Sequence, residues 1–543
     1  DRIQEEREMT RTVDVIVIGA GPNGLELGAY LSKAGLKVAV LERRHEMGGG
    51  LMTEMVTAPG YLHNTHAVYM MMADYAPVYA DLQLQEKYGL EHIYPSLQVA
   101  FPLSDGRCIC LYSDLERTCE SIARISKKDA DSYRDFYHRA RRAVDGLIAP
   151  ATYVPPMPVL DQVVKLQQTE LGRELSEYGE KSPKEIIDEF FENEHVKAFM
   201  LYLATHWGVA YDQPGMGYLV LLYLERATNY RLVRRGTHMV AQALQKAIYE
   251  YGGQVLNSQR IKRIIVEDGA ARGVELEDGT VIHASMAVAS TVDPHQTFLK
   301  LVGEKHLDGD FAAQIKGWQW EKYSLAGLHL ALKEAPDFTA ARTDPEINKA
   351  LVYVLGYKTE KDLIDEYEAI FRGEVREKAG FNCCFPSVHD PYQAPVGRHT
   401  GLLSRMAPYS LEPGGPDRWL DYSYREHVAE QLLATLQKYA PNMKKDRILR
   451  RYLSTPADIE NKFINMVEGG YKHGLYHPLQ MWSFRPHVQC SRNRKRIRYL
   501  YLAGSFCCAG ADVNLRAVDG AGTSWARTNW SSAWRTAFWT STG

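Results

Sequence analysis

The sequence predicts an α/β protein that folds into more than one domain. Three observations carry this prediction: the length of 543 residues, a strand-helix-strand pattern over residues 13–42, and short strands with tight turns between residues 255 and 289. A domain usually holds about 100 to 200 residues, so this chain forms several folding units and can enclose a sizeable ligand. With 45% hydrophobic and 24% charged residues, the composition excludes a disordered or fibrous protein.

Charge and cysteine content narrow the class of partner. The chain has 64 Lys and Arg against 67 Asp and Glu, a formal charge of −3, so we expect a small-molecule partner and no nucleic acid. The 8 cysteines lack zinc-site spacing, predict neither a disulfide scaffold nor a metal site, and favour a reducing, cytoplasmic compartment. No run of about 18 apolar residues occurs, so no membrane-spanning helix is predicted.

The first element is a β-α-β unit of the Rossmann type. Residues 13–18 (VDVIVI) predict a buried strand, an apolar helix follows up to Gly35, and residues 37–42 (KVAVLE) predict a second buried strand. The loop GAGPNG between strand and helix has the Gly-x-Gly-x-x-Gly spacing that allows a tight turn, a close pyrophosphate and close helix packing. The acid ending the second strand suits a ribose and argues against a 2′-phosphate, which leaves NAD and FAD as candidates. The residues predicted to bind the dinucleotide are Gly19, Gly21, Pro22, Asn23, Gly24, Glu42 and Arg43.

A second glycine cluster, Gly48, Gly49 and Gly50, follows within a few residues. Such a cluster lets the backbone lie close to a ligand again, although a flexible surface loop is the alternative. No further motif of the first kind stands between a strand and a helix, so the chain is expected to bind one dinucleotide.

The remaining chain alternates helical and strand patterns. Periodicity predicts helices over residues 114–142, 182–205, 236–250 and 422–439, the second with Ser182 as its N-cap. Strands are predicted over residues 107–112, 255–257, 261–266, 272–276, 281–284, 286–289, 325–332 and 499–504. Asp-Gly turns join the middle strands into a meander that returns to a central sheet, and a loop with a small-residue helix follows the last strand.

Residues 148–164 form an apolar stretch interrupted by prolines, which cannot be one simple helix. Two interpretations remain open: a loop packed on the protein's own core, or an exposed apolar entrance that touches a membrane surface.

The order of these blocks resembles the phytoene-dehydrogenase-like FAD oxidoreductases, which include carotenoid desaturases, carotenoid isomerases and retinol saturases within the amine-oxidase-like flavoproteins. The resembling pieces are residues 14–54, 59–61, 101–107, the helix after Gly236 with its meander, 455–460 (TPADIE) and 500–526. The resemblance implies FAD as cofactor, an FAD-binding domain from residues 9–75, 236–300 and 455–543, and a mixed α+β substrate domain from residues 76–235 and 301–454.

The resemblance also implies further cofactor contacts. Gly48, Gly49 and Gly50 would lie at the phosphate or flavin side, and Arg260 and Ile261 near the adenine. Gly504, Asp512, Val513 and Asn514 would lie near the ribityl chain and the flavin pyrimidine edge. Gly50 stands where amine-oxidase-like members often carry Arg, and residues 508–513 (CAGADV) replace a His-Pro-Gly-Gly-Gly-Val loop. The substrate and electron acceptor of relatives are therefore not carried over.

Candidate catalytic residues come from two segments. His473 and Gln480 belong to a polar and aromatic cluster before the last strand, and His66 and Tyr69 follow the second glycine cluster. A histidine has an ordinary pKa near neutrality and can serve as a base or stabilise an oxyanion. For each residue alone, a surface or satisfied core group is the alternative.

These observations predict an FAD-dependent oxidoreductase that desaturates, saturates or isomerises a carbon–carbon bond of a mostly apolar small molecule. Oxygen, a quinone or a nicotinamide remain open as electron acceptor, and the oligomeric state is not predicted. Peripheral membrane contact also remains open. The alternatives are an amine or alcohol oxidase on the same scaffold, and a non-catalytic assembly protein stabilised by flavin.

Overall fold

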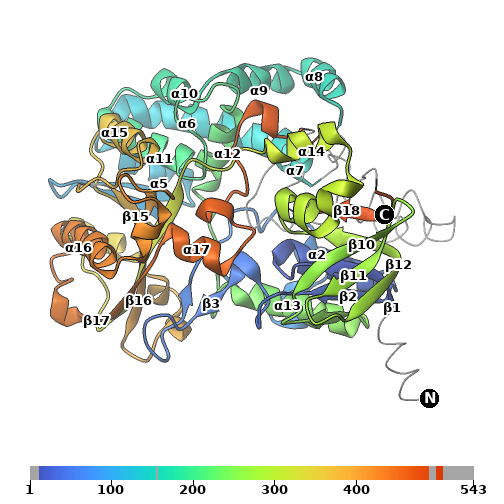
Figure 1. Ribbon diagram of the computed structural model, residues 1–543. Coiled ribbons are helices and arrows are strands. Elements are labelled where there is room, and N and C mark those ends of the chain that lie inside the picture. The colour runs from blue at the N-terminus through green and yellow to red at the C-terminus, as the bar shows by residue number, and fades with distance from the viewer. Residues whose placement is uncertain (1–11, 154–156, 379, 483, 488–496, 505–543) are drawn as a thin grey trace.

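Two seven-stranded sheets organise the part of the chain that the structure describes (Figure 1). The structure is a computed structural model, and it describes residues 12–153, 157–378, 380–482, 484–487 and 497–504. The two sheets lie on opposite sides of the molecule, and a layer of helices covers the second sheet and the space between them.

The first sheet contains the predicted β-α-β unit and the meander. Its strands are β10 (Ile261–Glu267), β11 (Ala270–Leu276), β12 (Val281–Ser290), β1 (Thr12–Ile18), β2 (Val38–Leu41) and β9 (Gln254–Leu256), in that order, with β18 (Leu500–Leu502) beside β12. β1 runs parallel to both β12 and β2, with Val15 opposite Ala287 and Val38. The predicted central sheet is confirmed.

The two faces of this sheet pack against different helices because alternate side chains of β1 point to opposite sides. Val15 and Val17 belong to the core formed with α2 (Pro22–Lys33) and α13 (His238–Glu250). Ile16 and Ile18 belong to the core formed with the π-helix His295–Gly303 and α14 (Gly309–Lys316). Residues 15–18 of β1 are therefore buried on both faces, as their apolar side chains predict.

The second sheet is mostly antiparallel. Its order is β17 (Ile448–Ser454), β13 (Ser324–Leu332), β16 (His399–Ala407), β15 (Phe381–Cys384), β14 (Val352–Leu355), β6 (Leu97–Pro102) and β7 (Cys108–Tyr112). Ala326, Leu328 and Leu330 of β13 pack in one core with Leu432 and Leu436 of α16 (Tyr422–Tyr439). α16 thus covers one face of this sheet, and its predicted bounds are confirmed.

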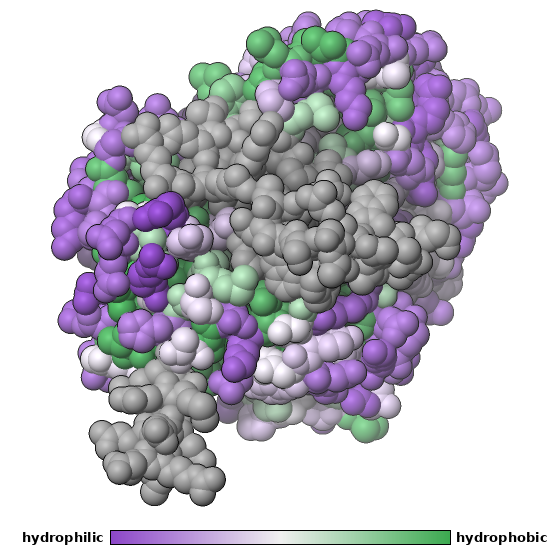
Figure 2. Space-filling view, turned by 90° about the vertical axis from the view of Figure 1, so that its right-hand side faces the viewer, coloured by the Kyte–Doolittle hydropathy of each residue, from purple (hydrophilic) through white to green (hydrophobic). Residues whose placement is uncertain are grey.

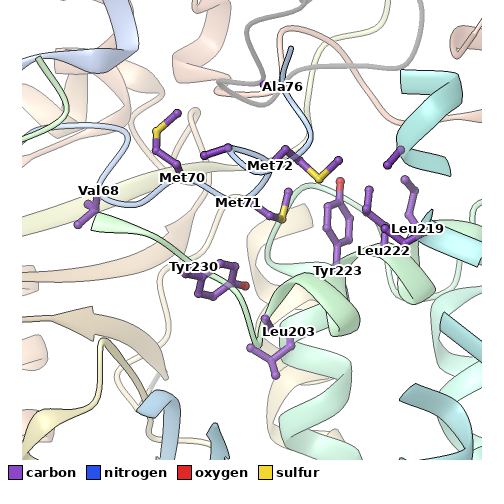
Figure 3. Packing of buried hydrophobic residues seen from close by; sticks show 14 of the residues in the cluster. Val68, Met70, Met71, Met72, Ala76, Leu203, Leu219, Leu222, Tyr223 and Tyr230 are labelled. Atoms are coloured by element: carbon purple, nitrogen blue, oxygen red, sulfur yellow. The ribbon is translucent and has the colours of Figure 1, made fainter. Parts of the chain in front are cut away.

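Helices cluster along the upper edge of Figure 1. They are α5 (Leu115–Ala123), α6 (Lys127–Ala143), α7 (Ala149–Thr152), α8 (Val159–Gln167), α9 (Glu170–Glu180), α10 (Pro183–Phe190), α11 (Glu194–Thr205), α12 (Tyr218–Arg226) and α15 (Glu360–Phe371). The segment 68–76 crosses this layer, and Figure 3 shows Met71 and Met72 against Tyr223 of α12. Arg226 of α12 fixes the segment by donating to the Met71 carbonyl at 3.0 Å and pairing with Asp74 at 2.8 Å.

Local polar groups divide two of the predicted helices. The helix predicted over residues 114–142 is two helices, α5 and α6. They are separate because the backbone turns after α5 and the Ser126 side chain caps the start of α6 by accepting from the Asp129 N–H. The helix predicted over 182–205 is likewise α10 and α11, the latter capped by Asn193. The predicted cap at Ser182 is confirmed, and with Glu185 it forms a complete capping box.

The proline-interrupted stretch is helical on both sides of residues 154–156. α7 precedes them and α8 follows. α8 has no buried residue, and Leu160 is 80% exposed. The first interpretation therefore describes only one part of the stretch: Ile148, Ala149 and Tyr153 pack in the protein's own core, whereas residues 157–164 do not. None of the described helices is both long and apolar enough to cross a membrane.

Candidate cofactor and substrate site

One cavity meets both sheets. It has a volume of about 510 Å³, within the range of ligand pockets, and its walls include the glycine-rich loop, residues 65–71, residues 259–261 and one face of the second sheet. The cavity therefore joins the predicted dinucleotide site to a second, more apolar region.

The loop between β1 and α2 opens onto this cavity. A Cβ atom at Gly24 would lie 1.8 Å from the Gly19 carbonyl oxygen, so helix and strand can approach this closely only with glycine. A Cβ atom at Gly21 would meet nothing within 4 Å, and Gly21 lines the cavity with Pro22 and Asn23. Gly21 is the N-cap of α2 and no side chain caps this helix. Because no side chain caps it, the N-terminus of α2 presents the positive end of the helix dipole to an anion in the cavity.

The second glycine cluster lies directly on the first. The Gly48 N–H donates to the Ala20 carbonyl at 2.8 Å, and a Cβ atom at Gly49 would lie 3.0 Å from the Gly21 Cα. Gly49 and Gly50 line the cavity, whereas Gly48 is not among its lining residues. Gly48 holds the backbone at a φ of +114°, a conformation that favours glycine. The surface-loop alternative does not describe this cluster.

Glu42 follows the last residue of β2 and lies at the cavity wall. Its carboxylate accepts the Ala20 N–H at 3.0 Å and the Arg44 N–H at 2.9 Å, which fixes it beside the loop. Arg260 and Ile261, which follow β9, line the same region. A dinucleotide in the loop would therefore meet both the acid and residues 260–261.

A cationic group closes the cavity next to the second glycine cluster. Lys462, at the end of α17 (Pro456–Lys462), pairs with Glu54, and the Thr65 hydroxyl donates to the same carboxylate at 2.8 Å. The Lys462 carbonyl accepts from Arg43 at 2.9 Å and from Arg44 at 3.4 Å. Arg43, Arg44 and Lys462 all line the cavity, so this end is electropositive and suited to phosphate groups.

The second sheet supplies the other wall through alternate residues of its strands. Its cavity-lining residues are Leu325 and Gly327 of β13, Asn382 and Cys384 of β15, Leu402, Ser404 and Met406 of β16, and Ser454 of β17. The residues between them, such as Ala326, Cys383 and Leu403, pack in the core under α16. The period of two along each strand therefore separates a ligand face from a core face.

Aromatic rings complete this wall. Tyr69 lies edge-on to Trp207 at 5.9 Å between ring centroids, and Trp207 lies 4.6 Å from His206. His206 stacks on Tyr202 at 5.0 Å. Burial lowers the pKa of His206 to about 3, so its ring is neutral near pH 7.

We call this second region the distal end. It is formed by Tyr69, Met70, Met71, Tyr202, His206, Trp207, Leu325, Gly327, Asn382, Cys384, Leu402, Ser404, Met406, Ser454, Tyr471 and His473. None of these described residues is Asp, Glu, Lys or Arg. The Lys472 ammonium, which is not a lining group, lies 4.9 Å from the centroid of the Trp207 ring. The distal end thus offers apolar contacts and neutral polar groups to a ligand. The Lys472 ammonium already occupies a position over the Trp207 ring.

The residues present fit an adenine dinucleotide. The open space over Gly21 leaves room for a pyrophosphate at the N-terminus of α2, Arg43, Arg44 and Lys462 line the same cavity, and Glu42 is fixed beside the loop where a ribose can reach it. The family called flavin containing amine oxidoreductase matches residues 24–513 of the chain. The chain belongs to the flavin containing amine oxidoreductases. It is therefore an FAD-dependent oxidoreductase, and its predicted cofactor, fold class and enzyme class are confirmed.

Relatives of this flavin containing amine oxidoreductase include proteins with named substrates. A limonene dehydrogenase subunit of Castellaniella defragrans is 37% identical over 513 residues, which cover 92% of each chain. The lycopene-forming phytoene desaturase of a Paracoccus species is 25% identical over 92% of this chain and 94% of its own. A solved structure of putrescine oxidase, a redesigned triple mutant, matches 95% of this chain and 99% of its own with a TM-score of 0.58 at 16% identity. That structural likeness supports the amine-oxidase-like architecture alone.

Three of the four candidate catalytic residues of this flavin containing amine oxidoreductase line the cavity: His66, Tyr69 and His473. Burial lowers the pKa of His66 to about 3 and that of His473 to about 4. The His473 Nδ1 must donate to the Asn465 carbonyl at 3.1 Å, because a carbonyl only accepts. A base with so low a pKa binds a proton weakly. The low pKa values therefore favour a role for both rings as neutral hydrogen-bonding groups.

Gln480 lies elsewhere. Its amide group accepts the Gln319 N–H at 2.9 Å and donates to the carbonyls of Gln319 at 2.8 Å and Leu475 at 3.1 Å. It is not among the lining residues, and its bonds join residues 475–480, which follow His473, to Gln319. Gly504 also does not line the cavity and lies against Asn23. Asp512, Val513 and Asn514 lie outside the described residues.

Several lining residues escaped the sequence analysis. Lys462 lies far from the glycine-rich loop in sequence, and only the fold brings the end of α17 beside Arg43. Trp207, Asn382 and Ser404 stand in segments without a motif: Asn382 and Ser404 lie on the cavity face of the second sheet, and Trp207 lies just after α11. Arg44 was also missed, although it stands directly after Arg43 in the sequence.

Proposed function

We propose that this FAD-dependent oxidoreductase removes hydrogen from a carbon–carbon or allylic unit of a mostly apolar small molecule bound in the distal end. The single observation that supports it most is the distal end itself, which joins the dinucleotide cradle and has no charged group among its described lining residues. The names of two relatives, a limonene dehydrogenase subunit and a phytoene desaturase, agree with apolar unsaturated substrates.

The proposal assigns separate tasks to the chain and to the cofactor. FAD, when bound, supplies two-electron redox chemistry. Gly21, Glu42 and the cations around Lys462 bind it, while aromatic rings such as Trp207 exclude water and orient the substrate by contact. Neutral His66 and His473 then face the substrate without adding charge.

The same proposal keeps the predicted division into domains. Residues 9–75, 236–300 and 455–543 would form the FAD-binding domain, and residues 76–235 and 301–454 the substrate domain. The described strands support this division, because the first sheet draws on β1, β2, β9 to β12 and β18, whereas every strand of the second sheet lies between residues 97 and 454.

An amine oxidase is the second candidate, and the distal end argues against it. An ammonium substrate would need a carboxylate or an unoccupied aromatic cage, and here the Lys472 cation already lies on the Trp207 ring. A non-catalytic flavoprotein is the third candidate. The cavity argues against it, because it extends past the glycine-rich loop to the second sheet and so leaves room for a substrate beside the cofactor.

Anaerobic titration of the FAD-loaded protein separates the three. Limonene, a longer polyene and the unsaturated ketone carvone are added in one series, and putrescine and cyclohexylamine in the other. Loss of the visible flavin absorbance with an alkene and none with an amine supports the proposal. Loss with an amine alone favours the oxidase, and no loss with any compound, together with normal FAD binding, favours the non-catalytic flavoprotein.

Exposed α8 supports a second proposal, peripheral contact with a lipid surface that supplies the apolar substrate. Leu160, Val163 and Val164 are 80%, 50% and 58% exposed on this helix, and Figure 2 shows hydrophobic residues gathered at the upper edge of the face where α8 lies. Co-sedimentation with phosphatidylcholine vesicles should be lost in Leu160→Gln/Val164→Gln, and equal sedimentation of both proteins would contradict the proposal.

A further inference from the structure

A row of polar and small residues crosses the cavity face of the second sheet. Asn382 of β15 pairs in register with Ser404 of β16, Ser404 with Gly327 of β13, and Gly327 with Ser454 of β17. All four line the distal end. The flanking lining residues on β16 are Leu402 and Met406, so the row is a polar line on an otherwise apolar wall.

One end of this row is held in place by α11. The Asn382 side-chain amide donates to the Tyr202 hydroxyl at 2.8 Å. The hydroxyl therefore accepts that bond, and its own proton can be donated to a third group. Burial raises the pKa of Tyr202 well above its usual range, which keeps the proton on the oxygen at any ordinary pH.

Polar atoms of the row have spare hydrogen-bonding capacity within the described part of the chain. The Asn382–Tyr202 bond uses one amide hydrogen and leaves the amide oxygen, which no other described side chain engages. The hydroxyls of Ser404 and Ser454 likewise make no hydrogen bond to a described residue. Water can pair with these groups in the open cavity, but a purely apolar ligand that displaces this water would leave them unpaired, so they favour a ligand that supplies partners.

The middle of the row is kept open by glycine. A Cβ atom at Gly327 would lie 3.2 Å from Leu402 Cδ1, closer than an ordinary contact. A side chain there would crowd the wall between Ser404 and Ser454. The row therefore combines hydrogen-bonding groups with a shallow depression in the sheet surface.

We propose that the Asn382–Ser404 end of this row, with Tyr202, is a subsite for one oxygen function, a hydroxyl or a carbonyl, carried by the otherwise apolar substrate. The inference rests on the proposed function and deepens it, because it names the substrate as an oxygen-bearing apolar molecule and not a plain hydrocarbon. The Asn382 amide and the hydroxyls of Tyr202 and Ser404 can donate to a carbonyl and both donate to and accept from an alcohol. The apolar flanks bind the carbon skeleton and the row fixes its orientation.

Binding of a matched pair of ligands tests the subsite without turnover. Menthone is a ketone and p-menthane is the saturated hydrocarbon of the same skeleton. Their dissociation constants are measured by calorimetry on the oxidised, FAD-loaded protein. An apolar wall alone would favour p-menthane, since the ketone gives up hydrogen bonds to water on entry. The informative quantity is the ratio of the two constants, compared between the natural protein and its variants.

Asn382→Leu and Ser404→Ala should each shift this ratio by about tenfold against menthone, which corresponds to one lost hydrogen bond. The binding of p-menthane should stay the same or tighten. Thr400→Val is the matched control. It removes a hydroxyl from the same strand at a site that does not line the cavity and whose Oγ1 has no partner among the described residues, and its ratio should not move.

An unchanged ratio in Asn382→Leu and Ser404→Ala, or equal weakening of both ligands, would overturn the subsite while leaving the proposed function intact. If neither ligand binds the natural protein, the distal end does not take apolar molecules, and the proposed function falls together with the subsite.

Discussion

Replacing Gly21 with Val should separate cofactor binding from folding. The position is extended, with φ of −70° and ψ of 179°, and an added Cβ atom meets no protein atom within 4 Å. The valine side chain would therefore occupy the space over the N-terminus of α2, which is the space that a pyrophosphate needs.

The expected losses differ in size. As an N-cap, valine is less favourable than glycine, so the apoprotein should lose about 1 kcal/mol of unfolding free energy. Blocking two hydrogen bonds from backbone N–H groups to a charged phosphate should cost about 3–6 kcal/mol of binding, or roughly a hundred- to ten-thousandfold in the FAD dissociation constant. Gly24→Ala should instead reduce the stability of the apoprotein more than Gly21→Val does. Its Cβ atom would lie 1.8 Å from the Gly19 carbonyl oxygen, and such overpacking costs about 3 kcal/mol in stability.

Both quantities can be measured on the same preparations. Urea unfolding of the apoproteins gives the stability, and quenching of FAD fluorescence during titration gives the affinity. Normal FAD affinity in Gly21→Val would refute the assignment of the cradle. Unfolding of Gly21→Val at the same urea concentration as Gly24→Ala would refute the interpretation of the open space.

Three further predictions concern stability. Lys462→Met should lose about 1–2 kcal/mol in urea unfolding, because among the described residues Glu54 then keeps Arg44, at 3.9 Å, as its one cationic partner. In a double-mutant cycle with Glu54→Gln, the double variant should lose less than the sum of the single losses, and strict additivity would contradict the pairing. His66 has a folded pKa of about 3 against the usual 6.5, so it takes up a proton on unfolding below pH 6.5 and the stability of the protein falls as the pH drops towards 3. His66→Gln should reduce the loss of unfolding free energy between pH 7 and pH 5 by about 2 kcal/mol. The same loss of stability in the variant and the natural protein would count against a buried neutral ring. Ser182→Ala should lower the stability by about 1 kcal/mol and Ser182→Thr by much less, with equal losses speaking against the capping box.

The amino-terminal unit could be predicted closely because its signals are local. The apolar run of β1, the glycine spacing and the acid at residue 42 each follow from backbone geometry within about 30 residues, and the structure places Glu42 on the Ala20 N–H at 3.0 Å. The meander was predictable for the same reason, since its turns carry Asp-Gly pairs. The helix over residues 422–439 has clear periodicity and an N-capping Asp421.

The ends of some helices and the residues of the distal end could not be predicted from the sequence as well. Ser126 and Asn193 look like ordinary polar positions in a helical pattern, and their capping role depends on the backbone turning at that point. Gln480 stands in a segment rich in functional groups, yet its amide is fully used by the backbone of residues 319 and 475. A residue type indicates what chemistry is possible, whereas burial and partners decide whether it reaches a ligand.

By itself, the sequence determined that the chain has one dinucleotide cradle, which residues form its turn, and that the ligand is an adenine dinucleotide. Those properties depend on short-range spacing and on the absence of side chains at Gly21 and Gly24. Only the tertiary structure decided that Lys462 closes this cradle and that Asn382, Ser404, Gly327 and Ser454 align in one row. The physical reason is that register between strands far apart in the chain is set by packing of the whole sheet, and a shift of one residue would turn every one of these side chains into the core.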